Sequence, residues 1–205
     1  MSNSMESPPI VADEPGHGDP ILNMLGDRVA LGPLRSDLLP VYERWENDFE
    51  LESLGTIHRF GPRTSENAAE SFDRLTNDPR RFHFTIYERA SLRPIGWTNL
   101  RDIDHYNRTA EFGISIAEPE YRERGLGTEA TRLVLRFGFS ALDLHSIWLN
   151  VQSHNERAMR AYRRAGFREI GRWRESKRFD GHVRDLIFMD CIATDFRAEQ
   201  AIPSV

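Results

Sequence analysis

The stretch Tyr121-Arg-Glu-Arg-Gly-Leu-Gly-Thr-Glu-Ala130 places two glycines just before an apolar-periodic segment that continues to about Leu144. The alternating segments 110–116 and 146–151, on either side, each predict a strand. At helical spacing within the apolar segment lie Ala130, Leu133, Val134, Phe137 and Ala141. That spacing predicts an amphipathic helix. The sequence therefore predicts a strand, a glycine loop, a helix and a second strand in succession.

The glycine loop has the composition of a phosphate-binding site. The first turn of a helix leaves backbone N–H groups without partners, and the helix dipole adds partial positive charge there. Gly125 and Gly127 would let a phosphate approach those amides. Arg122 and Arg124 add cationic donors nearby. Together with Leu126 and Thr128, these residues predict a pyrophosphate cradle.

Two motifs carry a family resemblance. Arg122-x-x-Gly125-x-Gly127 resembles the acyl-CoA loop of the GNAT superfamily of N-acetyltransferases, and the segment 155–167 resembles the next motif of that superfamily. The nearest branch holds ribosomal-protein N-terminal acetyltransferases and spermidine acetyltransferases, and the resemblance covers roughly residues 28–194. It implies a mixed α/β fold with a central splayed sheet flanked by helices. It also implies acetyl-CoA as co-substrate, received on one side of the splay, with an amine received on the other.

The resemblance assigns roles to several residues. Tyr162 would be the acid that protonates the CoA thiolate. The backbone of Ile114, Ser115 and Ile116 would hold the pantetheine arm or the thioester oxygen. Gly113 would permit a local bulge there. Asn155 would bond the CoA arm, and its side chain can also cap the following helix.

The sequence gives weaker evidence for the general base and for the residues that bind the acceptor amine. Glu111 lies on the strand face opposite Phe112 and could accept the amine proton. It could equally be a salt-bridged glutamate, and Tyr162 could simply pack in the core. Candidates for amine recognition are the acidic run with Glu46, Asp48, Glu50 and Glu52, together with Trp97. Without a role in binding, the acidic run would be a solvated charged surface and the tryptophan would pack in the core.

Composition bounds the remaining questions. Residues 1–26 are rich in Pro, Glu, Asp, Ser and Gly, which predicts a disordered tail before an acetyltransferase domain at 27–195 and a short tail at 196–205. The net charge of −5 argues against nucleic acid as the partner. No apolar stretch is long enough to cross a membrane. We expect a cytoplasmic protein without a metal, and a homodimer is left open.

Elsewhere the pattern predicts further elements. Strands are expected at 28–34, 81–87, 94–100, 167–175 and 183–191, and helices from residue 36 or 37 to about 48, from 64 or 65 onward, and from 155 to 166. The single cysteine, Cys191, has no histidine near it in sequence. Direct transfer in a ternary complex is therefore favoured over an acyl-cysteine intermediate.

The same residues are compatible with two other functions. The loop Gly125-Leu-Gly-Thr-Glu-Ala130 also fits G-x-G-x-x-A, the fingerprint of dinucleotide-dependent oxidoreductases. Against it, residues 118–124 separate the strand from the glycines, and Val151-Gln-Ser153 offers no acidic residue after the next strand. A non-catalytic acyl-CoA-binding module would need neither Tyr162 nor Glu111. Within the enzyme reading, the acceptor could be a peptide α-amine, a polyamine, an aminoglycoside-like antibiotic or an amino sugar.

Overall fold

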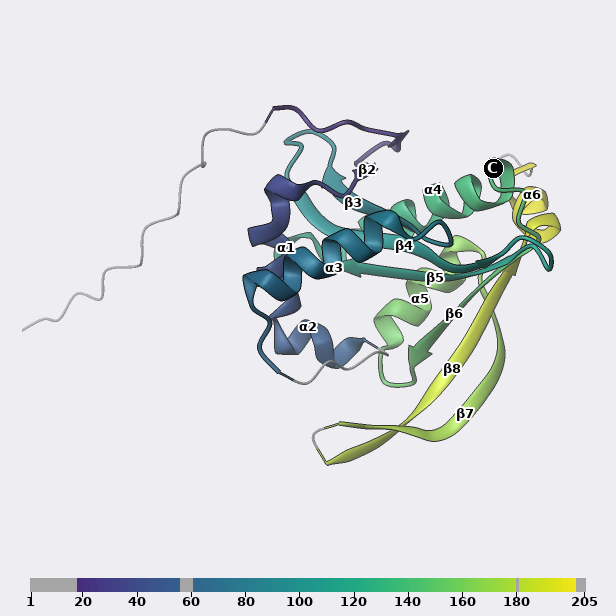
Figure 1. Ribbon diagram of the computed structural model, residues 1–205. Helices are drawn as coiled ribbons and strands as arrows, with labels where there is room; N and C mark the ends of the chain where they lie inside the picture. The colour runs from purple at the N-terminus through teal and green to yellow at the C-terminus, as the bar shows by residue number, and fades with distance from the viewer. Residues whose placement is uncertain (1–17, 56–60, 180, 202–205) are drawn as a thin grey trace, which may run out of the picture.

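The computed structural model describes residues 18–55, 61–179 and 181–201 (Figure 1). In chain order the elements are β1 (Met24–Leu25), β2 (Val29–Pro33), η1 (Ser36–Leu38), α1 (Leu39–Glu46), α2 (Phe49–Leu54), α3 (Ser65–Asn77), β3 (Phe82–Glu88), β4 (Pro94–Asp104), β5 (Thr109–Ile116), η2 (Pro119–Tyr121), α4 (Leu126–Ser140), β6 (Ser146–Gln152), α5 (Glu156–Ala165), β7 (Arg168–Phe179), β8 (His182–Ile192) and α6 (Ala193–Ala201).

The strands form one eight-stranded sheet in the order β1-β2-β3-β4-β5-β6-β8-β7. The β5–β6 pair is parallel, and the other pairs are antiparallel. A parallel pair needs a crossover connection, which α4 provides between β5 and β6. The predicted mixed α/β fold is confirmed.

Helices cover both faces of the sheet, as alternate residues of β3 show. Phe82 and Phe84 lie edge-on against Phe137 of α4, with ring centroids 5.3 and 5.5 Å apart. Thr85, which points the other way, hydrogen-bonds the hydroxyl of Tyr42 in α1 at 2.6 Å. Because strand side chains alternate between faces, α4 and α1 lie on opposite sides of the sheet. Most of the apolar core lies along α4, where Ala130 and Val134 are fully buried.

Strands β5 and β6 separate soon after they pair. Their register covers only Thr109–Glu111 against Ser146–Trp148. Beyond Glu111, β5 pairs with β4 alone, while β6 from Leu149 onward pairs with β8 alone. Figure 1 shows the two strands diverging from this point. The splay expected from the family resemblance is present.

Several local boundaries differ from the sequence prediction. The helix expected to reach about residue 48 ends at Glu46, because Asp48 instead caps a second helix, accepting bonds from the amides of Glu50 and Leu51. That second helix, α2, was not predicted as a helix. At the chain ends, Met24–Leu25 pair with β2 and a helix runs through 193–201, so regular structure extends into both segments expected to be tails.

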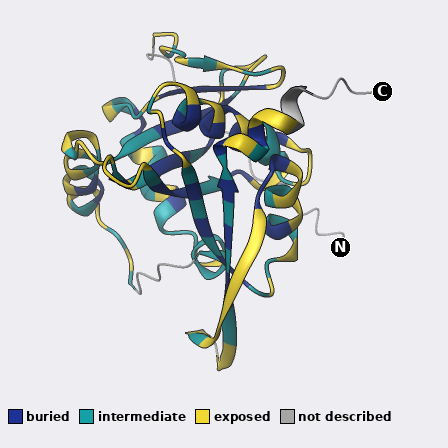
Figure 2. Ribbon diagram, turned by 90° about the vertical axis from the view of Figure 1, so that its right-hand side faces the viewer, coloured by how far each residue is buried: buried dark blue, intermediate teal, exposed yellow. Residues whose placement is uncertain are grey.

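The hairpin of β7 and β8 extends beyond the packed body of the domain. Figure 2 shows its outer part as exposed, whereas the middle of the sheet is buried. Ile170, Trp173 and Val183 are more than half exposed there. In the part of the chain that the structure describes, no helix is long and apolar enough to cross a membrane.

Candidate active site

The loop between β5 and α4 turns through left-handed residues before the helix begins. Glu123 and Gly125 have φ values of 61° and 80°, a conformation that costs glycine nothing. Helix α4 starts at Leu126, so its first amides lack carbonyl partners within the helix. A Cβ on Gly127 would meet only Ile116 Cγ1, at 3.5 Å. The predicted cradle therefore has both free amides and an open approach.

The two loop arginines have different positions. Arg122 lines the cavity described below and donates to the carbonyls of Ile116 at 3.0 Å and Ala117 at 2.7 Å, which ties the end of β5 to the loop. The Arg124 guanidinium instead lies over the Tyr121 ring, 5.6 Å from its centroid, and lines a separate hollow beside Arg28. The prediction placed both arginines at the phosphates, and only Arg122 lines the main cavity.

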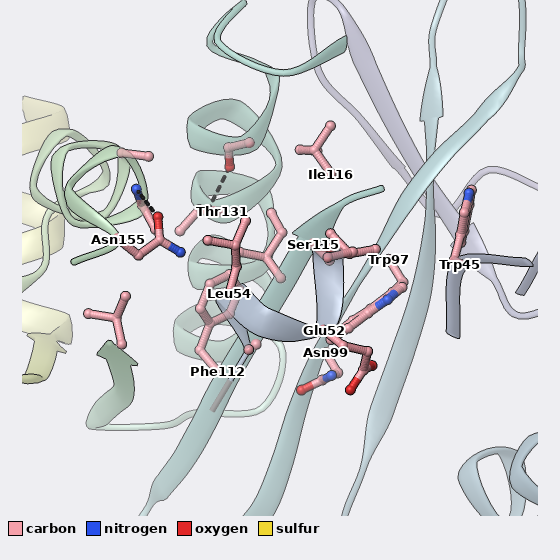
Figure 3. A pocket seen from close by; sticks show the side chains of 18 of the residues that line it. Trp45, Glu52, Leu54, Trp97, Asn99, Phe112, Ser115, Ile116, Thr131 and Asn155 are labelled. Atoms are coloured by element: carbon pink, nitrogen blue, oxygen red, sulfur yellow. Dashed lines mark hydrogen bonds between the residues drawn. The ribbon is translucent and has the colours of Figure 1, made fainter. Parts of the chain in front are cut away.

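A cavity of about 590 Å³ passes through the gap between β5 and β6. We call its part beside α4 and α5 the donor half; among its lining residues are Gly125, Gly127, Thr128, Thr131, Asn155 and Tyr162. The part beside α1, α2 and α3 is the acceptor half; it is lined by Trp45, Glu46, Glu52, Phe72, His83, Trp97 and Asn99, among others. Figure 3 shows side chains from both halves around one space. The volume is in the range of small-molecule sites.

The end of β5 forms the edge between the two halves. Ile114, Ser115 and Ile116 all line the cavity, and on this stretch β5 has a partner strand on one side only. The expected bulge at Gly113 is absent, because Asn99 pairs with Gly113 in regular register. Gly113 instead makes room for the Asn99 amide: a Cβ there would lie 3.1 Å from Asn99 Oδ1.

Tyr162 of α5 lines the donor half. Its ring packs edge-on against Phe112 and Phe167, at centroid distances of 6.3 and 5.9 Å. Burial raises the pKa of its hydroxyl to about 12. The Tyr162 side chain thus packs in the core and also lines the cavity. A role in core packing therefore does not rule out a role as the acid.

Asn155 caps α5 as predicted, its Oδ1 accepting from the Ala158 amide at 3.1 Å. Because the cap uses only the oxygen, the amide nitrogen remains for a ligand. Figure 3 shows that nitrogen directed into the cavity. Leu126, by contrast, has a side chain that is only 4% exposed, so it could offer a ligand only its backbone.

Glu111 lies at the point where β5 and β6 separate, and its side chain is held by two cavity-lining residues. Arg101 donates to its Oε1 and forms an ion pair with it, and Asn150 donates to the same oxygen at 2.9 Å. The carboxylate is nearly buried and does not line the cavity. The geometry matches the salt-bridged alternative rather than a base in contact with the amine.

The acidic run divides between wall and surface. Glu46 lines the acceptor half while its carboxylate bonds Arg63 at 3.1 Å. Glu52 also lines it, on the next helix. Asp48 is occupied in capping α2, and Glu50 is exposed outside the cavity. Trp97 lines the cavity from β4, and its role in binding the amine stays a prediction.

Sequence reasoning missed other lining residues. Three arginines of α5, namely Arg157, Arg160 and Arg164, line the cavity. Their signal was available in the second motif, where they recur at helical spacing with Ala161. His83 and Asn99 were also missed. They lie on separate strands, and only the register that pairs them brings them together.

Comparison with known proteins agrees with this geometry. Residues 28–168 match the acetyltransferase (GNAT) domain family. The spermidine N(1)-acetyltransferase of Escherichia coli (strain K12) is 36% identical over 135 residues, which are 66% of this chain and 71% of that protein. The alpha/beta-tubulin-N-acetyltransferase 9 of Mus musculus is 28% identical over 158 residues, 72% of this chain and 64% of that protein.

A similar fold occurs in a crystal structure of spermidine N-acetyltransferase from Vibrio cholerae in complex with CoA and spermine. It superposes with a TM-score of 0.77 and 24% identity, covering 84% of this chain and 99% of that one. The domain match spans well over half of the sequence, and the strand splay and glycine loop lie inside it. This chain therefore belongs to the GNAT family of N-acetyltransferases, which use acetyl-CoA as co-substrate.

Proposed function

We propose that this protein acetylates a primary amine of a small polyamine in the cytoplasm, by direct transfer from acetyl-CoA in a ternary complex. The observation that carries the proposal is the single cavity that reaches both faces of the sheet through the gap between β5 and β6. A thioester in the donor half and an amine in the acceptor half would meet at the edge of β5. Binding both reactants in one space supplies much of the rate enhancement of a two-substrate reaction.

The donor half fits the phosphates of coenzyme A. Amides at the start of α4 lack partners within the helix and could donate to an anion, and Gly127 leaves the approach open. Arg122 adds a cation beside them, and Arg157 and Arg160 add two more from α5. The Asn155 amide nitrogen would donate to the pantetheine arm.

Acetyl-CoA, when bound, supplies a thioester carbonyl: the amine nitrogen bonds to its carbon, the carbon–sulfur bond breaks, and the amine proton ends on the thiol. Backbone groups of residues 114–116, at the one-sided edge of β5, would hold the carbonyl oxygen. The Tyr162 hydroxyl, with its pKa raised to about 12 by burial, carries its proton at neutral pH. It would donate a hydrogen bond to the developing thiolate, and the amine proton would replace any proton that it gives up.

Glu111 is proposed to act indirectly, by positioning other residues and without contacting the reacting groups. Its carboxylate fixes Arg101 and Asn150, both of which line the cavity. This positioning role takes the place of the direct base role expected from the sequence. An acceptor that arrives as an ammonium ion would first lose one proton to water in the acceptor half. The second proton, released after the carbon–nitrogen bond forms, is the one that ends on the thiol.

The acceptor half favours a cationic amine. Glu46 and Glu52 bring carboxylates to its wall, and Trp45 and Trp97 bring aromatic rings that attract ammonium groups. The Escherichia coli relative, named a spermidine acetyltransferase, supports the same class. A protein amine is a second candidate, favoured by the mouse relative named as a tubulin acetyltransferase.

The test measures thiol release from acetyl-CoA with spermidine, butylamine and an N-terminal peptide, and detects the product by mass. We expect spermidine to gain an acetyl group, and Tyr162→Phe to lower kcat about 100-fold or more while acetyl-CoA still binds. Tyr106→Phe is the matched control, because Tyr106 is 93% exposed. If only the peptide were acetylated, the acceptor would be a protein amine rather than a polyamine. Full turnover by Tyr162→Phe would remove this residue from the mechanism.

A further inference from the structure

The floor of the acceptor half carries a cross-strand row of polar side chains. In register, His83 of β3 faces Asn99 of β4, and Asn99 faces Gly113 of β5. Two residues further along, Thr85, Trp97 and Ser115 form a parallel row on the same face. His83, Asn99 and Trp97 all line the cavity. The first row thus leads from the edge of β5, where transfer would occur, across the floor of the acceptor half.

Two polar atoms in this row lack partners. Neither Asn99 Oδ1 nor His83 Nε2 has a hydrogen-bond partner among the described residues, and both atoms are buried. Asn99 is only 2% exposed as a residue. An unpaired buried polar group costs about 1–3 kcal/mol, so a pair of them in one row of a cavity floor indicates a site completed by a ligand.

The arginines around the row are already paired. Arg101 binds Glu111, Arg63 binds Glu46 at 3.1 Å, and Arg81 binds Asp78 at 2.9 Å. Pairing leaves each guanidinium partly neutralised by a carboxylate, which limits both its attraction for an anion and its repulsion of a cation. Burial, together with the charges of Arg81 and Arg101, lowers the pKa of His83 to about 4. A neutral imidazole can accept a hydrogen bond through one ring nitrogen.

We propose that Asn99 and His83 form a subsite for the second, non-reacting ammonium group of a diamine or polyamine acceptor. The proposal rests on the proposed function and extends it by locating the group that distinguishes a polyamine from a simple amine. An ammonium has three donors and no acceptor, which matches an amide oxygen and a neutral ring nitrogen. Glu52 of α2 also lines the acceptor half, where its carboxylate would add favourable charge.

Strand spacing fits a short linker between the two amines. Neighbouring strands lie about 4.8 Å apart, so Asn99 stands one spacing and His83 two spacings from β5. A linker of a few methylene groups spans that distance.

The experiment compares butanediamine, aminobutanol and butylamine, which share a four-carbon chain. Binding to the CoA-loaded protein is measured by calorimetry, and turnover by thiol release. Asn99→Ala should lower the ratio of diamine to butylamine affinity by about tenfold, and His83→Ala should lower it severalfold. Asn99→Asp, which keeps an acceptor oxygen and adds charge, should retain or raise the ratio. Asn77→Ala, at an exposed position on α3, is the control.

The outcomes separate this proposal from the one it rests on. Equal losses for diamine and butylamine in Asn99→Ala would overturn the subsite, as would aminobutanol binding as tightly as the diamine in the wild type. Absence of turnover with every amine, alongside diamine binding that still depends on Asn99, would overturn the proposed function and leave the subsite standing. Thermal unfolding of each variant identifies any that fail to fold, and Asn99→Asp then carries the test.

Discussion

The indole N–H of Trp45 donates a 2.8 Å hydrogen bond to Glu118 Oε1. Trp45 lines the acceptor half of the cavity, whereas Glu118 immediately precedes the turn that leads to the phosphate loop. Arg44 donates to the same carboxylate oxygen, and Glu118 is only 4% exposed. A single buried carboxylate therefore joins the amine-binding wall to the loop that would bind the donor.

Glu118→Gln should weaken both halves of the site together. Burial alone would raise the pKa of Glu118, but hydrogen bonds from Arg44 and Trp45 outweigh it and lower the pKa, so the carboxylate is charged at neutral pH. The side-chain amide of glutamine carries no negative charge, so it cannot replace the carboxylate as a charged acceptor for Arg44 and Trp45. We expect KM to rise severalfold for the amine and for acetyl-CoA in steady-state kinetics.

Glu120→Gln is the control for that change, because Glu120 lies on the same turn, is half exposed and pairs with Arg93 at 3.2 Å. It should leave both KM values within about twofold of wild type. If Glu118→Gln altered only thermal stability, with both KM values intact, the link between the two halves would have no role in binding.

Glu111→Gln tests whether this residue is a base or a support. Its partner Arg101 is 16% exposed in its side chain, and removing one member of a buried ion pair costs about 3 kcal/mol. We expect a loss of that order in the free energy of unfolding, with the shape of the pH–rate profile unchanged. The double variant Arg101→Met, Glu111→Leu should regain most of the stability. Loss of one limb of the pH–rate profile would restore Glu111 as the base.

His83 predicts a specific acid sensitivity. Its pKa is about 4 in the folded protein, below the ordinary 6.5, because burial and nearby arginines disfavour the charged form. The unfolded chain therefore takes up a proton first as the pH falls, and stability decreases between about pH 6.5 and pH 4. The contribution of His83 should be about 2 kcal/mol between pH 7 and pH 5.

Urea unfolding at pH 7 and at pH 5 measures this loss of unfolding free energy. Because glutamine does not titrate, the His83→Gln variant should lose about 2 kcal/mol less than the wild type between the two pH values. An equal loss in the two proteins would mean that His83 already carries a proton in the folded state at pH 5.

The central strand–loop–helix–strand unit was predictable because its signals are local. The spacing of Ala130, Leu133 and Val134 fixes one face of α4, and the glycines fix where that helix begins. The cap that Asn155 forms was local as well, whereas the roles expected of Tyr162 and Asn155 toward CoA came from the family resemblance of the second motif. The loop residues that line the cavity, such as Gly127 and Thr128, followed from the rule that amides at a helix start bind anions.

What the sequence could not provide depends on contacts between distant segments. Glu111 lies on β5 and Glu118 two residues beyond its end. Only the partners Arg101 and Trp45, supplied by other elements, give these two acids their roles. Arg124 is expected at the phosphates, and its guanidinium lies over the Tyr121 ring, a contact that the motif alone does not reveal. The short helix α2 escaped prediction because Asp48 looked like part of a charge run when it is a cap.

The most direct measurement is the affinity for CoA of Gly127→Glu, determined by calorimetry against wild type and Gly127→Ala. A Cβ at this position would meet only Ile116, at 3.5 Å. An acidic residue in the first turn of a helix is favourable for the helix, so the fold should be retained. The account predicts affinity close to wild type for Gly127→Ala and a loss of at least about tenfold for Gly127→Glu, because the carboxylate would occupy the place of the pyrophosphate. Wild-type affinity in Gly127→Glu would show that the diphosphate binds away from the start of α4.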